Sequence, residues 1–196
     1  MHNRGSTLIK HAATLVLATL WSAVQAADFS GSATVIYGHK YLDQGDWGPI
    51  ESQSELGVGI TYQVPEWPVP VVGYLLSSSG SGTDSKSFAS PVKATGKTTE
   101  LSGGARKNLT EGSTKVFVEG GLVYIAATLN ATNLVTGASD RGTSSALGLW
   151  LGGGLDAMLT PTVSVGGLIR MSKADAKGDS LGGTHFGLYA AFHFQP

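Results

Sequence analysis

A set of ionisable side chains lies on one face of the segments in which apolar and polar residues alternate. They form two groups along those segments: Lys40, Glu55, Glu100, Arg170 and His185 in one, and Arg106, Glu119, Asp156 and His193 in the other. Both groups mix acids with bases, and a charge in a low-dielectric interior is costly unless it is paired. The pattern favours two hypotheses: a polar network that plugs an enclosed space, or ion pairs that gate a narrow pore.

The acidic segment after the first alternating stretch is a second candidate site. Asp43, Asp46 and Glu51 offer the oxygen ligands that a hard divalent cation prefers. Their spacing matches no calcium-binding loop, and Asp beside Gly is ordinary turn chemistry. We therefore expect neither a metal site nor a cofactor.

The elements that must position these residues are β-strands, because apolar and polar residues alternate with a period of two. In 145–159, for example, Leu147, Leu149 and Leu151 share one face, and Gly148 lies on the other. The charges fall mostly on the glycine-rich face. Eight strands are predicted, at 29–41, 52–64, 69–79, 97–108, 114–128, 145–159, 162–173 and 184–194.

The connections between these strands alternate between long and short. The predicted long loops are 42–51, 80–96, 129–143 and 174–183, and short turns separate the remaining strands. Outer-membrane barrels have this asymmetry, with longer loops outside and tight turns at the periplasmic end. Eight strands form a barrel with an interior just wide enough to be filled by side chains. We therefore predict an all-β fold: an eight-stranded antiparallel up-and-down transmembrane barrel with short periplasmic turns and longer outer loops.

The composition agrees with a barrel that hides much of its surface from water. Charged residues make up 14% of the chain, against roughly 25% in soluble domains. After residue 26 there is no run of about 18 apolar residues, so a closed barrel is the remaining way to cross a bilayer. The alternative, a soluble sandwich or lipocalin-like barrel, would need charges on its outward face. A formal net charge of −1 gives no basic footprint for nucleic acid.

Residues 1–26 have the layout of a secretory signal peptide. Arg4 and Lys10 form a basic start, 12–23 is a short apolar run, and 24–26 is a small-residue cleavage site. The apolar run is too short for a membrane-spanning helix, which disfavours an N-terminal anchor. We expect cleavage after Ala26 and export of 27–196 as a single barrel domain.

The last predicted strand ends in aromatic residues, with Phe186, Phe192 and Phe194 on one face. In this it resembles the closing strand of bacterial outer-membrane barrels, and 29–194 as a whole resembles the small OmpA/OmpX-type barrels, a porin-like class. Gln195 and Pro196 follow Phe194, whereas the family usually ends on the aromatic. The resemblance implies a Gram-negative outer membrane, contact with its lipids including lipopolysaccharide, and recognition of the last strand by the barrel-assembly machinery. We expect a monomer.

Aromatic side chains are placed to anchor such a barrel at the membrane interfaces. The candidates are Tyr37, Tyr62, Trp67 and Tyr124. Trp150 departs from the scheme, because its parity points it inward. It either fills the lumen or marks a β-bulge that shifts the register.

The class that the resemblance implies includes lipid A acyltransferases and deacylases, which use His with Ser and an acid. Here His185 is the candidate base and 77–79 are serines at a similar level. A hydroxyl nucleophile needs its base within hydrogen-bond reach, and the third and eighth strands lie far apart around a barrel. A His-x-Ser spacing is also missing, because Phe186 and Gly187 follow His185.

These patterns together favour a small outer-membrane barrel with a structural or loop-mediated recognition role and a lumen plugged by a polar network. The first alternative is a narrow channel for small or hydrophobic solutes, and the second is a lipid A-modifying enzyme. We expect no enzymatic activity.

Overall fold

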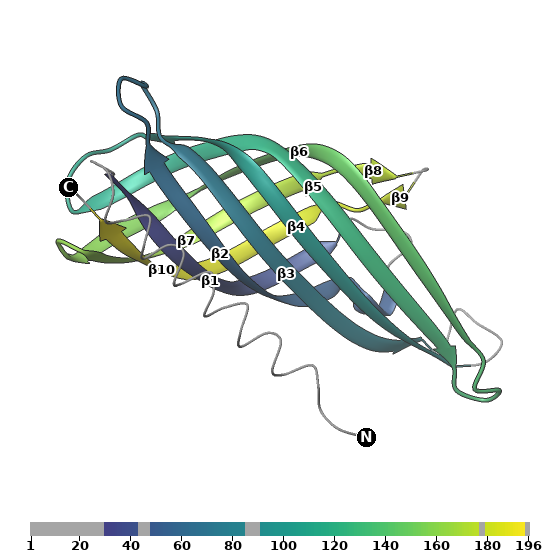
Figure 1. The fold of residues 1–196 in the computed structure, drawn as a ribbon. Coiled ribbons are helices and arrows are strands. Elements are labelled where there is room, and N and C mark those ends of the chain that lie inside the picture. The colour runs from purple at the N-terminus through teal and green to yellow at the C-terminus, as the bar shows by residue number, and fades with distance from the viewer. Residues whose placement is uncertain (1–29, 43–47, 85–90, 177–178, 195–196) are drawn as a thin grey trace, which may run out of the picture.

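A computed structural model describes residues 30–42, 48–84, 91–176 and 179–194. Within these ranges eight strands form a closed antiparallel barrel, which confirms the predicted fold class (Figure 1). The barrel strands are β1 (Ser30–Leu42), β2 (Ser52–Gln63), β3 (Val71–Asp84), β4 (Val92–Asn108), β5 (Thr114–Asn133), β6 (Ser139–Thr160), β7 (Val163–Lys173) and β10 (Gly183–Phe194). The predicted signal peptide lies outside the described residues and stays a prediction.

Each strand pairs with its neighbour along the chain, and β10 pairs with β1 to close the barrel. Val35, for example, lies opposite Val58 on β2 and opposite Ala190 on β10. Closure satisfies the backbone groups of both terminal strands, which would otherwise form exposed sheet edges. Residues of even and odd number therefore alternate between the interior and the outward face on every strand.

The two ends of the barrel differ. At the end that we call the turn end, the connections 64–70, 109–113 and 161–162 are short. At the opposite end, the hairpin end, the hairpins β3–β4 and β5–β6 project beyond the rest of the wall, on the right in Figure 1. There the β7–β10 connection contains the short pair β8 (Asp175–Ala176) and β9 (Asp179–Ser180), and the β1–β2 connection contains the 3-10 turn η1 (Gly48–Ile50).

Two of the predicted long loops consist in large part of strand. The segment 129–143 continues β5 to Asn133 and starts β6 at Ser139, so only 134–138 connects them. The segment 80–96 likewise extends β3 to Asp84 and starts β4 at Val92. The apolar alternation ends earlier than the strands because a ladder is held by backbone hydrogen bonds, which polar side chains do not interrupt.

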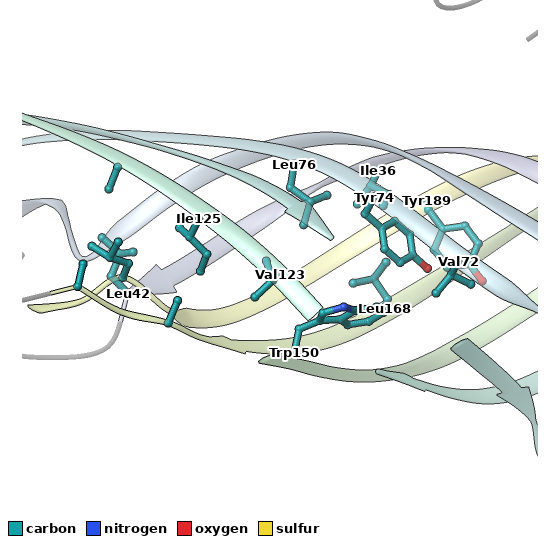
Figure 2. Packing of buried hydrophobic residues seen from close by; sticks show 14 of the residues in the cluster. Ile36, Leu42, Val72, Tyr74, Leu76, Val123, Ile125, Trp150, Leu168 and Tyr189 are labelled. Atoms are coloured by element: carbon teal, nitrogen blue, oxygen red, sulfur yellow. The ribbon is translucent and has the colours of Figure 1, made fainter. Parts of the chain in front are cut away.

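Large aromatic side chains and glycines fill the interior together. Figure 2 shows Tyr74, Trp150 and Tyr189 pointing into the barrel with aliphatic residues around them. The glycines make room for the rings: a Cβ at Gly166 would overlap the ring of Tyr189, and one at Gly154 would lie 2.8 Å from Cζ of Phe117. The glycine-rich face is therefore a packed interior rather than a wide aqueous channel.

The outward face is apolar over the middle of the barrel. Leu147, Leu149 and Leu151 on β6 are each about two thirds exposed, and Leu188 on β10 is 73% exposed. Soluble monomers rarely expose contiguous apolar surface of this kind. In the described ranges, no helix has the length and apolar character needed to span a bilayer.

Candidate functional site

Five ionisable side chains from five strands meet inside the barrel toward the hairpin end. We call them the hairpin-end cluster: Lys40 on β1, Glu55 on β2, Glu100 on β4, Arg170 on β7 and His185 on β10. None of them is more than 2% exposed. The cluster spans the lumen, because these strands lie on different sides of the barrel.

Glu100 is the centre of the hairpin-end cluster. Its Oε1 lies 2.6 Å from Nζ of Lys40, and its Oε2 lies 3.2 Å from Nη2 of Arg170. The hydroxyl of Ser172 donates a third hydrogen bond to Oε1 at 3.0 Å. One buried carboxylate is thus shared by two cations, and such charge-assisted bonds are the strong ones.

His185 joins the two carboxylates of the cluster. Its Nδ1 lies 2.7 Å from Oε2 of Glu55, which also accepts a hydrogen bond from Ser78 at 2.8 Å. Its Nε2 lies 3.2 Å from Oε1 of Glu100 and 3.1 Å from the hydroxyl of Ser172. Both ring nitrogens of His185 thus face carboxylate oxygens, and the imidazole bridges Glu55 and Glu100.

A layer of aromatic rings lies next to the cluster inside the barrel. The rings of Tyr74 and Trp150 meet edge to face, with centroids 5.7 Å apart, and the guanidinium carbon of Arg170 lies 4.4 Å from the Trp150 ring centroid. Trp150 is 3% exposed and pairs in regular register with Gly121 and Ser172. Trp150 therefore fills the lumen, and the register shift of β6 lies elsewhere, between Met158 and Thr160.

A smaller turn-end cluster begins at the Tyr74 hydroxyl and consists of Tyr74, Arg106 and Glu119. Nε of Arg106 donates to Oε2 of Glu119 at 2.9 Å, and the Tyr74 hydroxyl donates to the same oxygen at 2.8 Å. Nη2 of Arg106 donates to the Tyr74 oxygen at 2.6 Å, and the guanidinium lies over the ring of Phe117. Arg106 and Glu119 are direct register partners on β4 and β5.

Near the rim of the turn end, Asp156 and His193 form a looser contact. Oδ2 of Asp156 lies 4.0 Å from Nε2 of His193, and the Ser164 hydroxyl lies 2.7 Å from the same nitrogen. Asp156 is 6% exposed.

All five members of the first predicted group meet in the hairpin-end cluster, whereas the second group divides into the turn-end ion pair and the Asp156–His193 contact. Within the first group, the ion partner of Lys40 is Glu100 across the lumen, and its register partner on β2 is Gln53. Several polar members of the network did not appear among the sequence candidates: Gln53, Tyr74, Thr98, Ser102 and Ser172. Most of them lie two residues from a predicted charge on the same strand, so strict use of the period of two would have found them.

The contacts also connect a hydroxyl, an imidazole and a carboxylate in a row: Ser172 contacts His185, and His185 contacts Glu55. A nucleophile, its base and an orienting acid are connected in the same order in hydrolytic enzymes. The sequence candidates 77–79 do not take this part, since Ser78 binds Glu55 directly. Ser172 is 4% exposed, and its hydroxyl also binds Glu100. A hydroxyl enclosed by charged side chains has no room for an ester carbonyl, so the geometry supports structural bonding.

The aromatic residues predicted for the interfaces mostly point away from the interior. Tyr37, Trp67 and Tyr124 are 63%, 56% and 47% exposed, whereas Tyr62 is half-buried. Of the acidic candidates in the first loop, Glu51 is exposed. Asp43 and Asp46 lie outside the described residues.

No protein-family model matches the chain, and no curated protein matches it in sequence. Solved structures do match its fold. A major outer membrane protein of Thermus thermophilus matches with a TM-score of 0.61 at 15% identity, over 86% of this chain and 100% of that one. Ail, the attachment invasion locus protein of Yersinia pestis, matches with a TM-score of 0.57 at 13% identity, over 85% of this chain and 99% of that one.

Ail in complex with the heparin analogue sucrose octasulfate matches with a TM-score of 0.54 at 15% identity, over 85% of this chain and 97% of that one. At these identities the comparisons establish the fold: this chain has the barrel architecture of small outer-membrane proteins.

Proposed function

We propose that this protein is a small bacterial outer-membrane barrel whose lumen is closed to solutes and whose role is structural or based on recognition through its projecting hairpins. The apolar outward face supports the membrane location, because an aqueous setting would leave side chains such as Leu149 and Leu188 in water. The fold shared with solved outer-membrane barrels is in keeping with it.

The observation that supports a closed lumen is the stack of interacting side chains along the barrel axis. The hairpin-end cluster contacts Trp150 through Arg170, the ring of Trp150 packs against Tyr74, and the Tyr74 hydroxyl donates to Glu119 in the turn-end cluster. At the hairpin end, Ile50 and Leu181 are 1% exposed, and the Leu181 carbonyl accepts a hydrogen bond from Lys40. Opening a pore along this axis would break bonds in every layer.

The β5–β6 hairpin supports a role in recognition. Its tip presents Leu134 and Val135 with 52% and 70% of their surface exposed. The Oδ1 atom of Asn133 accepts hydrogen bonds from the backbone of Val135 and Thr136, and Gly137 supplies a positive φ of 72°. The turn is thus held by its own hydrogen bonds, and it offers two apolar side chains to a partner outside the cell.

The remaining expected partners belong to the same proposal. Outer-membrane lipids would cover the apolar face, and the barrel-assembly machinery would recognise β10, whose Phe186, Leu188 and Phe192 point outward. Tyr37 and Tyr124 would lie at the lipid interface. We propose in addition that the chain is exported through the periplasm by a cleaved signal peptide and that the barrel is a monomer.

The test combines gel mobility with conductance. The chain refolded in detergent should migrate differently before and after boiling, and the same preparation should give no steady conductance in a planar bilayer. A double variant, Trp150→Ala with Arg170→Ala, should raise the conductance, whereas Lys173→Ala on the outward face should not. Steady conductance of the unaltered protein would instead establish the narrow channel, and a protein soluble without detergent would overturn the membrane location.

A further inference from the structure

A shallow groove of about 610 Å³ lies on the wall of the barrel toward the hairpin end. Its lining includes His39 on β1, Ser54 on β2, Ser79 on β3 and Lys97 on β4. These four are consecutive register partners, so they form one continuous row across four strands.

The groove opens outward and is separate from the lumen. The neighbours of the row in sequence point inward: Lys40, Ser78 and Thr98 are each at most 1% exposed. Since successive side chains of a strand lie on opposite faces, His39, Ser79 and the rest of the row project away from the barrel axis. The side chains of the row are accordingly exposed.

The row marks the place where the outward face changes from apolar to polar. On β1, Tyr37 precedes His39 on the same face; on β2, Leu56 is followed toward the hairpin end by Ser54. On β4 the same face changes from Leu101 to Lys97 within four residues. An amphiphile whose chains lie on the apolar wall would therefore bring its headgroup into the groove.

The groove favours an anionic headgroup. Lys97 and His39 can donate to an anion, the serines add hydroxyl donors, and none of the described side chains that line the groove is acidic. Arg141 lies beside Asn130, another lining residue, in the register of β5 and β6. Ammonium and hydroxyl donors arranged along a groove suit the several oxygens of a phosphate group.

We infer that this groove binds the phosphate-bearing headgroup of an outer-leaflet membrane lipid. The inference rests on the proposed outer-membrane location and names a lipid contact of that barrel. Lys97 supplies the charge-assisted bond, Ser54 and Ser79 contact the remaining headgroup oxygens, and the acyl chains lie along Leu56 and Leu101.

The experiment measures lipid binding to the refolded full chain in detergent by native mass spectrometry. The probes are bisphosphorylated lipid A, the same lipid A after enzymatic removal of its phosphates, and inorganic phosphate as a competitor. The test variant is His39→Gln with Lys97→Gln. The matched control is Lys173→Gln, since Lys173 is also exposed near the hairpin end but lies on β7, away from the groove.

The expected result is a loss of lipid A affinity of roughly tenfold in the test variant, as for the loss of a hydrogen bond to a charged group. Lipid A should bind the control variant as tightly as it binds the unaltered protein, and inorganic phosphate should not displace it. Dephosphorylated lipid A should bind the unaltered protein as weakly as lipid A binds the test variant. Equal binding by the test variant, an equal loss in Lys173→Gln, or displacement by free phosphate would overturn the inference. Heat-dependent gel mobility shows for every variant whether the barrel has folded in detergent. A folded barrel that does not bind lipid A would contradict the lipid site alone, whereas a chain that forms no heat-sensitive barrel would contradict the proposed membrane location.

Discussion

The two ion clusters inside the barrel are built from the same kinds of residue but differ in reach. The turn-end pair Arg106–Glu119 joins adjacent strands, and its arginine side chain is 13% exposed. In the hairpin-end cluster, Glu100 binds Lys40 and Arg170 from strands that are not its neighbours, and all three side chains are at most 2% exposed. The turn-end ion pair links the two strands of one hairpin, and the hairpin-end cluster links strands on opposite sides of the lumen.

The difference in burial sets the cost of losing a charged partner in each cluster. An arginine near a rim can take up water when its carboxylate is removed. Cations in a dry interior cannot, so an uncompensated charge there costs several kcal/mol.

Glu100→Gln should have the largest effect, because it leaves Lys40 and Arg170 without their shared carboxylate. We expect a loss of about 3–5 kcal/mol in the free energy of unfolding. The measurement is the urea midpoint of the protein folded in lipid vesicles. A loss below about 1 kcal/mol would show that water reaches the cluster and that the lumen is open at this level.

Glu119→Gln should cost less than Glu100→Gln, about 1–3 kcal/mol. Arg106 keeps its bond to the Tyr74 oxygen and its contact with Phe117 in this variant, and its side chain is partly exposed. The same urea titration measures the difference. Equal losses in the two variants would remove the distinction between a dry and a rim-accessible cluster.

Ser172→Ala should cost about 1 kcal/mol, the usual contribution of one hydrogen bond, because Glu100 and His185 keep their other partners. The mass of lipid A in cells that express either version should be the same. A change in lipid A mass caused by the unaltered protein but absent with Ser172→Ala would instead make Ser172 a nucleophile and the protein an enzyme.

Lys97→Gln should change the free energy of unfolding by no more than about 0.5 kcal/mol, because exposed positions contribute little to stability. Lys40→Gln provides the contrast, since Lys40 is fully buried against Glu100. Both variants are compared by urea titration. If the two lysines had similar effects, the division into an interior network and an outward polar groove would be wrong.

Much of the fold could be predicted because its pattern is local. A period of two assigns Glu100 and Arg106 to the same face of β4, and Arg106 and Glu119 come together across a single short turn. The end of β5 and the start of β6 at the hairpin end could not be predicted, because polar residues on both faces give no alternating pattern there. The two strands are paired in that region by backbone hydrogen bonds alone.

The alternation of side chains along a strand was enough to predict the eight barrel strands, the face of most charged residues and the concentration of charge on the inner face. The carboxylate that each cation meets depends on how the barrel closes, and the alternation does not contain that information. Lys40 lies two residues from the register partner of Glu55 yet binds Glu100, 60 residues away, because closure of the barrel brings opposite walls within reach of long side chains. The structure also decided that Trp150 fills the lumen, because its register with Gly121 and Ser172 is regular and its ring meets the ring of Tyr74 inside the barrel.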